Sequence, residues 1–333
     1  MTPPLTTNQQ TVPVFLAPLA GITDLPFRNL VSRFGADRVV SEMVASQEMV
    51  QAKPGVREKA ELGLGSGNTA VQIAGREAHW MAEAARQVEG RGAKIIDINM
   101  GCPAKKVTSA SGAGASGSAL MKDLDHALSL IEAVAEAVSI PVTLKTRLGW
   151  DDNMLNAPEL ARRAEAAGVA MITIHGRTRC QFYKGRADWA AIARVKAAVG
   201  VPVIANGDIV DAQSAREALT LSGADGVMIG RGAQGRPWLL AQVAAQLAGR
   251  AQDGPDVPEG AALADMVCGH YQDMLAFYGA DLGNRVARKH LGWYLADAGC
   301  NAGLRKRVLT SRDPEEVLRL LPDALSDGER AAA

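Results

Sequence analysis

The sequence of 333 residues lacks an excess of charge of either sign. It contains 36 Lys and Arg residues and 36 Asp and Glu residues, so its formal net charge at pH 7 is zero. Proteins that bind nucleic acid or anionic membranes over much of their surface usually carry a net positive charge. Any contact with RNA must therefore depend on local basic patches.

Cysteine is scarce as well. The four cysteines are far apart and form no CxxC pair: Cys102, Cys180, Cys268 and Cys300. This spacing argues against a thiolate metal knuckle and against a disulfide framework, and it favours a reducing compartment. We therefore predict no metal site and a cytoplasmic location.

Long apolar runs are missing too. No uninterrupted run approaches the roughly 18 residues that a membrane-spanning helix needs. The first residues, MTPPLTTNQQ, show neither the basic start nor the apolar segment of a signal peptide. We expect no membrane association and assign residues 1–12 to an N-terminal tail. Apolar residues still make up 47% of the chain, which is enough for a sizeable core.

Short β-rich runs alternate with alanine-rich helical segments from residue 13 to about residue 240. Eight runs are read as strands: VPVFLAPLAG, DRVVSEMV, TAVQIAG, KIIDINMG, PVTLKTR, AMITIHG, VPVIANGD and DGVMIGRG. They are mostly continuous and apolar, as is typical of parallel strands covered on both faces. Eight such units predict an α/β fold, a (β/α)8 TIM barrel over residues 13–245. A doubly wound open sheet is the alternative.

The remainder of the chain has a different pattern. The stretch AGRAQDGPDVPEG is aperiodic and rich in Gly, Pro and Asp, so residues 246–260 are predicted to be a linker. Only helical patterns follow it, such as RVARKHLGWYLADAG. Residues 261–333 are therefore predicted to form a small all-helical C-terminal domain.

Polar or special residues stand at the carboxyl end of nearly every predicted strand. Barrel enzymes place their active sites at this end, so a full ring of such residues indicates a catalytic site. The alternative is that they are ordinary loop starts. The positions are Pro18, Leu19, Ala20, Gly21, Glu42, Met43, Gln72, Asn99, Cys102, Lys145, Arg147, His175, Asn206, Gly207, Asp208, Gly230 and Arg231.

Three features of this ring indicate the kind of ligand. Glycines in NGDI and GRG, after the last two strands, let backbone N–H groups approach a phosphate. The amide of Gln72 suits the carbonyl and imide edge of a flavin, and a buried Lys145 would stabilise the negative charge of the reduced ring. An ion pair of Lys145 with Asp97 is the alternative. His175 is either a satisfied core histidine or a flavin or substrate contact.

Seven motifs in order resemble the tRNA-dihydrouridine synthases, most closely the bacterial B-type (NifR3-like) branch: LAPLAGITDLPFR, QIAG, DINMGCPAKKV, LKTRLGW, TIHGRTRCQFYKGRADW, ANGDI and IGRG. Members of that family are FMN-containing barrels that use NADPH to reduce uridine to 5,6-dihydrouridine in tRNA. The resemblance covers residues 13 to about 240 and extends through RVARKHLGWYL into the helical domain, which it implies binds tRNA.

The resemblance also implies roles for individual residues. Backbone groups of Pro18, Leu19 and Ala20 would contact FMN, Gln72 and Lys145 would contact its ring system, and His175 would lie close by. The FMN phosphate would lie on Asn206, Gly207, Asp208, Gly230 and Arg231. Cys102 matches the catalytic proton donor of the family.

Cys102 also suits that role by its chemistry. Reduction of the uracil C5=C6 bond needs a hydride at C6, which flavin N5 can supply, and a proton at C5 from an acid on a short, well-fixed loop. A thiol with an unperturbed pKa of about 8.5 is mostly protonated at neutral pH. Nearby Lys105 and Lys106 would favour the thiolate, so we expect them to point toward the RNA backbone instead. The alternative for Cys102 is a buried structural thiol.

A D-loop uridine of tRNA must be flipped out of its stack to reach such a pocket, which requires a basic approach surface. Candidate substrate or tRNA contacts are Asn99, Lys105, Lys106, Arg147, Arg177, Arg179, Lys184, Arg186, Arg285, Arg288, Lys289 and His290. A merely solvated face is the alternative for the basic residues. No stable protein partner is implied.

Two glycine-rich stretches remain. GLGSGN, residues 63–68, precedes a strand, which is the wrong order for a dinucleotide-binding turn, so NADPH is expected to use the flavin pocket before tRNA arrives. Ten of the eleven residues from 108 to 118 are Ser, Ala or Gly. They predict either a flexible lid or a simple length variation. Rival functions are a flavin barrel acting on a free pyrimidine and a non-catalytic barrel that binds RNA or phosphate.

Overall fold

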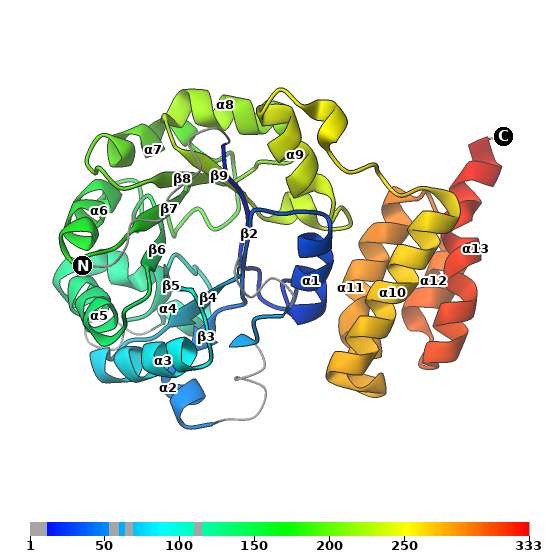
Figure 1. Cartoon of the computed structure of the whole chain (residues 1–333), viewed down its shortest axis with the longest axis horizontal. Helices are drawn as coiled ribbons and strands as arrows, with labels where there is room; N and C mark the ends of the chain where they lie inside the picture. The colour runs from blue at the N-terminus through cyan, green and yellow to red at the C-terminus, as the bar shows by residue number, and fades with distance from the viewer. Residues whose placement is uncertain (1–11, 53–59, 64–68, 110–114, 333) are drawn as a thin grey trace.

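The computed structural model describes residues 12–52, 60–63, 69–109 and 115–332, and it contains a closed barrel of parallel strands (Figure 1). The sheet order is β2-β1-β9-β8-β7-β6-β5-β4-β3, and a further pairing of β2 with β4 closes the ring. The strands are β1 (Val14–Leu16), β2 (Arg38–Val40), β3 (Val44–Ala45), β4 (Thr69–Ala74), β5 (Ile95–Met100), β6 (Val142–Arg147), β7 (Met171–His175), β8 (Val203–Asn206) and β9 (Gly226–Ile229).

The predicted TIM barrel is therefore confirmed, with one local difference. The second predicted run, DRVVSEMV, is broken: β2 ends at Val40, and the short β3 begins only at Val44. Between them the Ser41 hydroxyl accepts a hydrogen bond from the Gln72 N–H, and the Glu42 carboxylate accepts one from the Gly21 N–H. These contacts draw the chain across the strand ends and interrupt its pairing.

Helices cover the outside of the barrel. They are α1 (Leu25–Arg33), α2 (Ser46–Val50), α3 (Ala78–Gly90), α4 (Lys105–Thr108), α5 (Leu124–Ala137), α6 (Ala157–Ala166), α7 (Trp189–Lys196), α8 (Ala212–Ser222) and α9 (Leu239–Leu247), with short 3-10 turns η3 (Gly117–Lys122), η4 (Arg231–Ala233) and η5 (Ala251–Asp253). Local sequence sets their ends. Asp211 and Ser214 form a capping box that starts α8, and Gly223, with φ of 63°, ends it.

The inside of the barrel is divided into an apolar floor and a polar mouth. Phe15, Met171, Ile204 and Met228 belong to one buried apolar cluster, and Met171 and Ile204 lie near the start of their strands. The Arg38 guanidinium lies 4.7 Å from the centroid of the Phe15 ring and adds to this floor. Polar residues come later along the same strands, so they lie toward the carboxyl ends, where barrel sites form.

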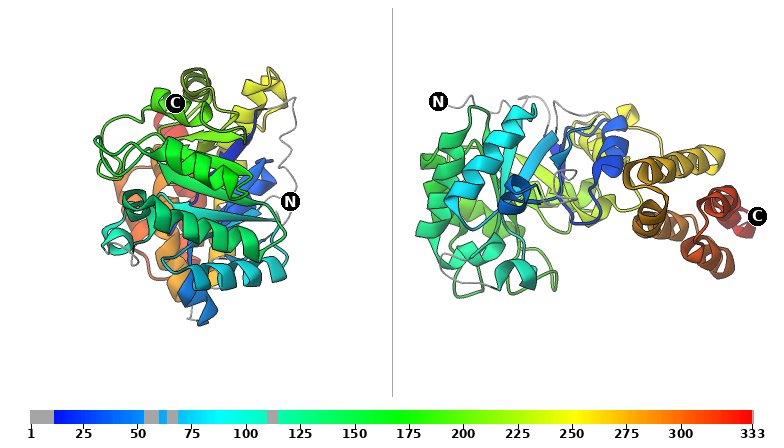
Figure 2. Two further views of the ribbon diagram at one scale, coloured as in Figure 1. Left: turned by 90° about the vertical axis from the view of Figure 1, so that its left-hand side faces the viewer. Right: turned by 90° about the horizontal axis from the view of Figure 1, so that it is seen from below.

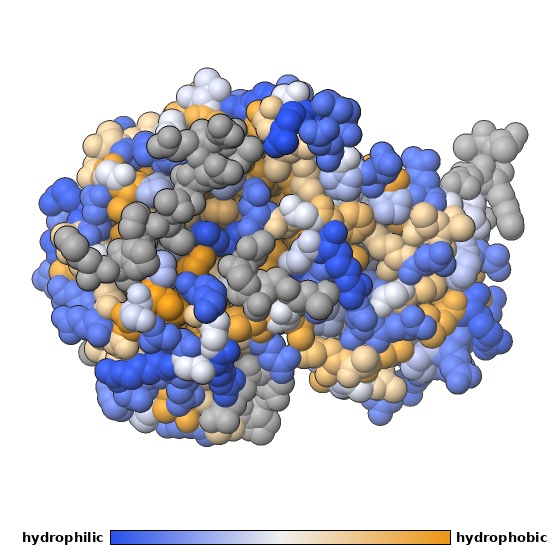
Figure 3. Space-filling view, in the orientation of Figure 1, coloured by the Kyte–Doolittle hydropathy of each residue, from blue (hydrophilic) through white to orange (hydrophobic). Residues whose placement is uncertain are grey.

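Four helices follow the barrel and lie beside it as a separate bundle (Figures 1 and 2): α10 (Gly260–Tyr278), α11 (Ala280–Asp297), α12 (Ala302–Thr310) and α13 (Pro314–Ala332). They enclose their own core, which includes Tyr271, Met274, Leu291 and Leu321. Within the described helices, none is long and apolar enough to cross a membrane. The face shown in Figure 3 is a mixture of hydrophilic and apolar residues.

The helical region after the barrel is confirmed, whereas the division at residues 245 and 260 stays a prediction. Within the predicted linker lies one 3-10 turn, η5. Three predictions fall wholly or partly outside the described residues. They concern the tail 1–12, of which only residue 12 is described, the stretch 63–68 and the middle of the stretch 108–118.

Candidate active site

A chain of short hydrogen bonds crosses the barrel mouth from β6 to the loop after β5. The Thr143 hydroxyl and the Gln72 amide Nε2 each donate to the buried carboxylate of Asp97, both at 2.6 Å. Gln72 Oε1 accepts from Asn99 Nδ2 at 2.7 Å. Because one carboxylate accepts both donors, the orientation of the Gln72 amide is fixed, and this in turn fixes that of Asn99.

The fixed side chain of Asn99 in turn holds the loop that carries Cys102. Its Oδ1 accepts the backbone N–H groups of Cys102 at 3.0 Å and Gly101 at 3.2 Å. On the other side, the Cys102 carbonyl accepts from the N–H and the hydroxyl of Ser118 at 3.1 and 2.9 Å. Cys102 is half-buried, so its thiol stands on a fixed loop that still has access to the mouth.

Lys145 and His175 face the same space from β6 and β7. Lys145 Nζ donates to Asn206 Oδ1 at 3.0 Å, and Asn206 donates to the Met228 carbonyl at 2.8 Å. Burial, with help from Arg147, lowers the pKa of Lys145 to about 8. Asp97 accepts from Gln72 and Thr143, and Lys145 donates to Asn206. Among the described residues, Lys145 and Asp97 therefore do not form the ion pair that was the alternative.

His175 is kept neutral by its surroundings. Burial and the neighbouring charges of Arg147 and Lys145 hold the pKa of His175 well below its usual value. Arg177 Nη1 lies 3.3 Å from His175 Nε2. A neutral imidazole at the mouth can accept or donate a hydrogen bond without adding charge.

The predicted phosphate end lies where β8 and β9 finish. Gly207 and Asp208 both have positive φ, 115° and 55°, a conformation in which successive N–H groups can point to one anion. A Cβ on Gly207 would lie 2.8 Å from the His175 ring, so only glycine fits there. The Asp208 carboxylate pairs with Arg177 and with Arg231 Nη2, the latter at 3.2 Å. Only the backbone of Asp208 is therefore suited to an anion.

The loop after β1 reaches the same end. Thr23 Oγ1 accepts from the Leu19 N–H at 2.8 Å, and the Leu19 carbonyl accepts from the N–H groups of Ile22 and Thr23 at 3.0 Å. Pro18 and Leu19 are half-buried, and Ala20 is exposed. The Leu19 side chain lies 3.7 Å from the Cβ position of Gly230, so the ends of β1 and β9 lie side by side.

Two arginines predicted to contact substrate or tRNA lie inside the protein instead. Arg177 is 1% exposed and is held by Asp208 and by the carbonyls of Lys184 and Gly185. Arg147 is equally buried. It donates to the carbonyls of Gly101, Thr178 and Phe182. The prediction that Arg177 lies on a basic approach surface is wrong, and Arg147 organises loops around the mouth.

Two further basic candidates in the helical domain also differ from expectation. His290 is buried against Phe27 of the barrel, with ring centroids 4.9 Å apart, so its prediction as a surface contact is wrong. Arg288 is half-buried and donates to the Ser311 carbonyl at 3.3 Å. Arg285 and Lys289 are exposed, and Lys289 Nζ lies 3.2 Å from the Cβ position of Gly21 at the barrel mouth.

The remaining basic candidates surround the mouth. Lys105, Lys106, Lys184 and Arg186 are exposed, and the lysine pair opens the short helix α4 directly after the cysteine loop. Arg179 is half-buried; its Nη2 donates to the Thr108 hydroxyl at 2.8 Å, and it stacks on Trp150 at 4.6 Å. A cleft of about 390 Å³ beside α4 is lined by Trp80, Lys106 and Glu77, among others.

Tyr183 is a functional candidate that the sequence reasoning missed. It is 52% exposed, and the guanidinium groups of Arg147 and Arg231 lie 5.4 and 5.3 Å from its ring centroid. Its ring is 6.2 Å from that of His175. An exposed aromatic residue among arginines in the QFYKG segment after β7 was the available signal.

Comparisons with known proteins give a consistent result. The family model described as "Dihydrouridine synthase (Dus)" matches residues 15–328. A protein of Rhodobacter capsulatus named "Probable tRNA-dihydrouridine synthase" is 63% identical over 320 residues, covering 96% of each chain. One of the same name from Rhizobium leguminosarum is 57% identical, covering 96% of this chain and 98% of its own. "tRNA-dihydrouridine synthase B" of Xanthomonas campestris is 47% identical, covering 93% and 92%.

Among solved structures, histamine dehydrogenase from Rhizobium sp. 4-9 matches with a TM-score of 0.52 at 13% identity. The match covers 78% of this chain and 48% of that one. At this identity the likeness concerns the fold alone, and it supports the barrel architecture.

Proposed function

The chain belongs to the dihydrouridine synthase family, and from this premise we propose that it reduces the C5=C6 bond of specific uridines in tRNA to 5,6-dihydrouridine. One observation carries the proposal most strongly: the hydrogen-bonded chain from Asp97 through Gln72 and Asn99 holds the Cys102 loop at the mouth, where Lys145 also lies.

The residues at the mouth suit FMN. The Thr173 hydroxyl, beside Lys145 in the β6–β7 register, is buried and has no hydrogen-bond partner among the described residues. Such an orphaned group, a buried ammonium and a glycine-containing turn with positive φ are appropriate to a flavin ring with a phosphate tail. When bound, the flavin supplies the hydride for uracil C6.

Each residue at the mouth then has a defined task. Cys102 would hold the proton that is delivered to uracil C5. Lys145, charged below about pH 8, would neutralise negative charge on the reduced ring. Gln72, through an amide hydrogen not used by Asp97, would contact the ring edge together with His175. The backbone of Pro18, Leu19 and Ala20 would line the ring.

The phosphate would lie on the N–H groups of Gly207, Asp208 and Gly230, near Arg231. Arg231 is 54% exposed and shares the Asp208 carboxylate with Arg177, so its guanidinium retains donors for an anion. Asn206 holds Lys145 and thereby links the phosphate end to the ring end of the pocket.

The tRNA would approach over exposed basic groups around the mouth. Lys105 and Lys106 on α4 lie next to Cys102 in the sequence, and Lys289 reaches Gly21 from the helical domain. Arg285 is on the same helix as Lys289, α11. Phosphate contacts of this kind fix the orientation of a nucleic acid, and the flipped D-loop uridine would then enter between Cys102 and the flavin, near Asn99. NADPH would reduce the flavin in the same pocket beforehand.

The decisive test is a reaction with purified components. Protein loaded with FMN and supplied with NADPH is expected to form dihydrouridine, measured by mass spectrometry, in tRNA from a strain that lacks the gene. Free uridine and uracil, tested in parallel, should remain unreduced. Turnover of the free bases but not of tRNA would favour a small-molecule flavin barrel. Purified protein that is colourless even after addition of excess FMN would instead favour a non-catalytic barrel.

A further inference from the structure

Two histidines of the helical bundle and one aspartate of the barrel meet in the buried junction between these regions. Asp24 caps the start of α1, His270 lies on α10 and His290 on α11. Each is no more than 2% exposed. One potential ligand atom from each of the three residues lies within 4.8 Å of the other two. A single ion bound to all three at about 2.0–2.2 Å would draw these atoms closer together.

Three of the four ring nitrogens in this cluster have no hydrogen-bond partner among the described residues. His270 Nδ1 lies 3.1 Å from the Tyr294 hydroxyl, but its Nε2 is buried and unpartnered, and so are both ring nitrogens of His290. Buried polar atoms are almost always paired, because leaving them unpaired costs free energy. Unpaired nitrogens that converge on a carboxylate indicate a missing ligand.

Hydrogen bonds fix the carboxylate of Asp24. It accepts hydrogen bonds from the Phe27 N–H and the Tyr278 hydroxyl, both at 3.0 Å, which hold the carboxylate in place.

Contacts outside the cluster resemble those that orient metal ligands. A metal-binding imidazole usually gives its second nitrogen to an oxygen nearby. Tyr294 provides this oxygen for His270. One nitrogen of His270 is therefore directed to an oxygen, and its second nitrogen, like both nitrogens of His290, is left for an ion.

Charged groups around the cluster are mixed in sign. Glu42 and Arg28 act on Asp24, Arg33 acts on His270, and Lys289 acts on His290. Arg28 is itself held by the carbonyls of Thr23 and Glu61. Two imidazoles and one carboxylate are a ligand set for a single divalent ion of borderline softness.

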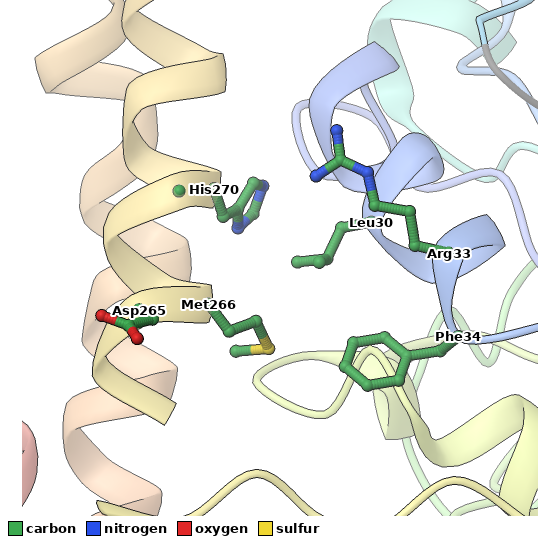
Figure 4. Close-up of a pocket in the computed structure, with 7 residues that line it drawn as sticks. Leu30, Arg33, Phe34, Asp265, Met266 and His270 are labelled. Carbon is green, nitrogen blue, oxygen red and sulfur yellow. The ribbon is translucent and has the colours of Figure 1, made fainter. Parts of the chain in front are cut away.

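A cleft lies against one side of the cluster. A cleft of about 270 Å³ between α1 and α10 is lined by Leu30, Arg33 and Met266 and ends at His270 (Figure 4). Such an opening gives an ion an entry path, which a credible metal site requires.

We propose that Asp24, His270 and His290 bind one Zn²⁺ ion, with a water molecule in the fourth position, and that the ion fastens the helical bundle to the barrel. The absence of CxxC pairs excludes only a thiolate knuckle, and this site uses histidines from two helices that are distant in sequence from Asp24. The proposal does not depend on the redox function.

The test uses the full-length protein, stripped with a chelator and titrated with Zn²⁺ in a calorimeter. His270→Gln and His290→Gln remove one ligand each, and His79→Gln removes an exposed histidine on α3 as the matched control. Wild type and the control should bind one ion per chain, and the two cluster variants should bind it at least about 100-fold more weakly. Zn²⁺ should raise the melting temperature only where it binds.

Two results would overturn the proposal. One is that wild type takes up no stoichiometric Zn²⁺; the other is that both cluster variants bind it as tightly as wild type, which means adventitious surface binding. If either variant fails to fold, Co²⁺ added to the wild type decides. An intense visible spectrum of low-coordinate Co²⁺ supports the site, and the weak spectrum of the hydrated ion refutes it.

Discussion

Gln72 Nε2 and Asp97 Oδ2 lie 2.6 Å apart inside the barrel, and this bond fixes which end of the Gln72 amide faces Asn99. An amide can rotate by half a turn at little cost, whereas a carboxylate only accepts. Asp97 therefore acts as a positioning residue for the loop that carries Cys102.

Asp97→Asn should disturb the hydrogen-bonded chain through Gln72 and Asn99 while preserving the size of the side chain. The new amide can accept from Gln72 or from Thr143, but one of these donors then meets an NH2 group. We expect a loss of about 1–3 kcal/mol in the free energy of unfolding, measured with urea, and a lower kcat with flavin still bound. Glu132→Gln, which removes an exposed carboxylate on α5, serves as the control. Unchanged kcat in Asp97→Asn would contradict the positioning role.

Cys102→Ala tests the proposed role of the thiol as the proton donor. Removal of a positioned proton donor is expected to lower turnover of tRNA by about 10²–10⁴-fold, while the flavin spectrum and tRNA binding stay as in wild type. Cys180→Ala, at an exposed cysteine, should keep the wild-type rate. Cys102 would lose its assignment if its alanine variant reduced tRNA normally.

The lowered pKa of Lys145 predicts how flavin affinity depends on pH. Its pKa is lowered from 10.5 to about 8, mainly by burial, so the side chain is charged below pH 8 and becomes neutral as the pH rises through that value. Affinity for the reduced, anionic flavin should therefore fall above pH 8 in fluorescence titrations of the wild type. Lys145→Met should bind weakly at every pH and show no such step. A step of the same size in Lys145→Met would assign it to another group.

The two arginines on Asp208 should differ in their energetic roles. Asp208→Asn leaves the fully buried Arg177 without its counter-charge, and we expect a loss of about 3 kcal/mol in unfolding free energy. Arg231→Ala removes only the exposed partner and should cost about 0–1 kcal/mol. Denaturant titration separates these values. Similar losses of unfolding free energy in both variants would mean that burial does not determine how much each arginine's ion pair with Asp208 contributes to stability.

Lys106→Glu tests the approach of tRNA. The exposed side chain on α4 is expected to contact phosphate, so its reversal should raise KM for tRNA and flatten the salt dependence of binding. Reduction of the bound flavin by NADPH should not change. Lys94→Glu, at an exposed residue just before β5 and thus at the opposite end of the barrel, is the matched control. Equal effects of the two variants would exclude a specific contact.

The sequence was sufficient for the strands other than the broken second run, and for the residues at the strand ends, because apolar runs and the polar residues that end them are local patterns. It was insufficient for Arg147 and Arg177. Their burial depends on carbonyls of the loop after β7, which folds back over them. The chain from Asp97 to Asn99 was missed for the same reason: its members come from neighbouring strands, and only the register of β4 and β5 brings them together.

His290 shows the limit most clearly. Within RVARKHLGWYL it follows three basic positions, and the motif suggests a charged surface. The helix instead presents Arg285 and Lys289 outward and turns His290 onto Phe27. Which face of a helix meets a neighbouring domain is decided by docking, and no periodicity within the helix specifies it.

The apolar floor made by Phe15, Met171, Ile204 and Met228 has a kinetic consequence. A barrel closed at one end has a single entrance. A dinucleotide and a tRNA that both bind inside it therefore cannot be bound at the same time. Initial-rate plots against one of them, at several fixed concentrations of the other, should then give parallel lines.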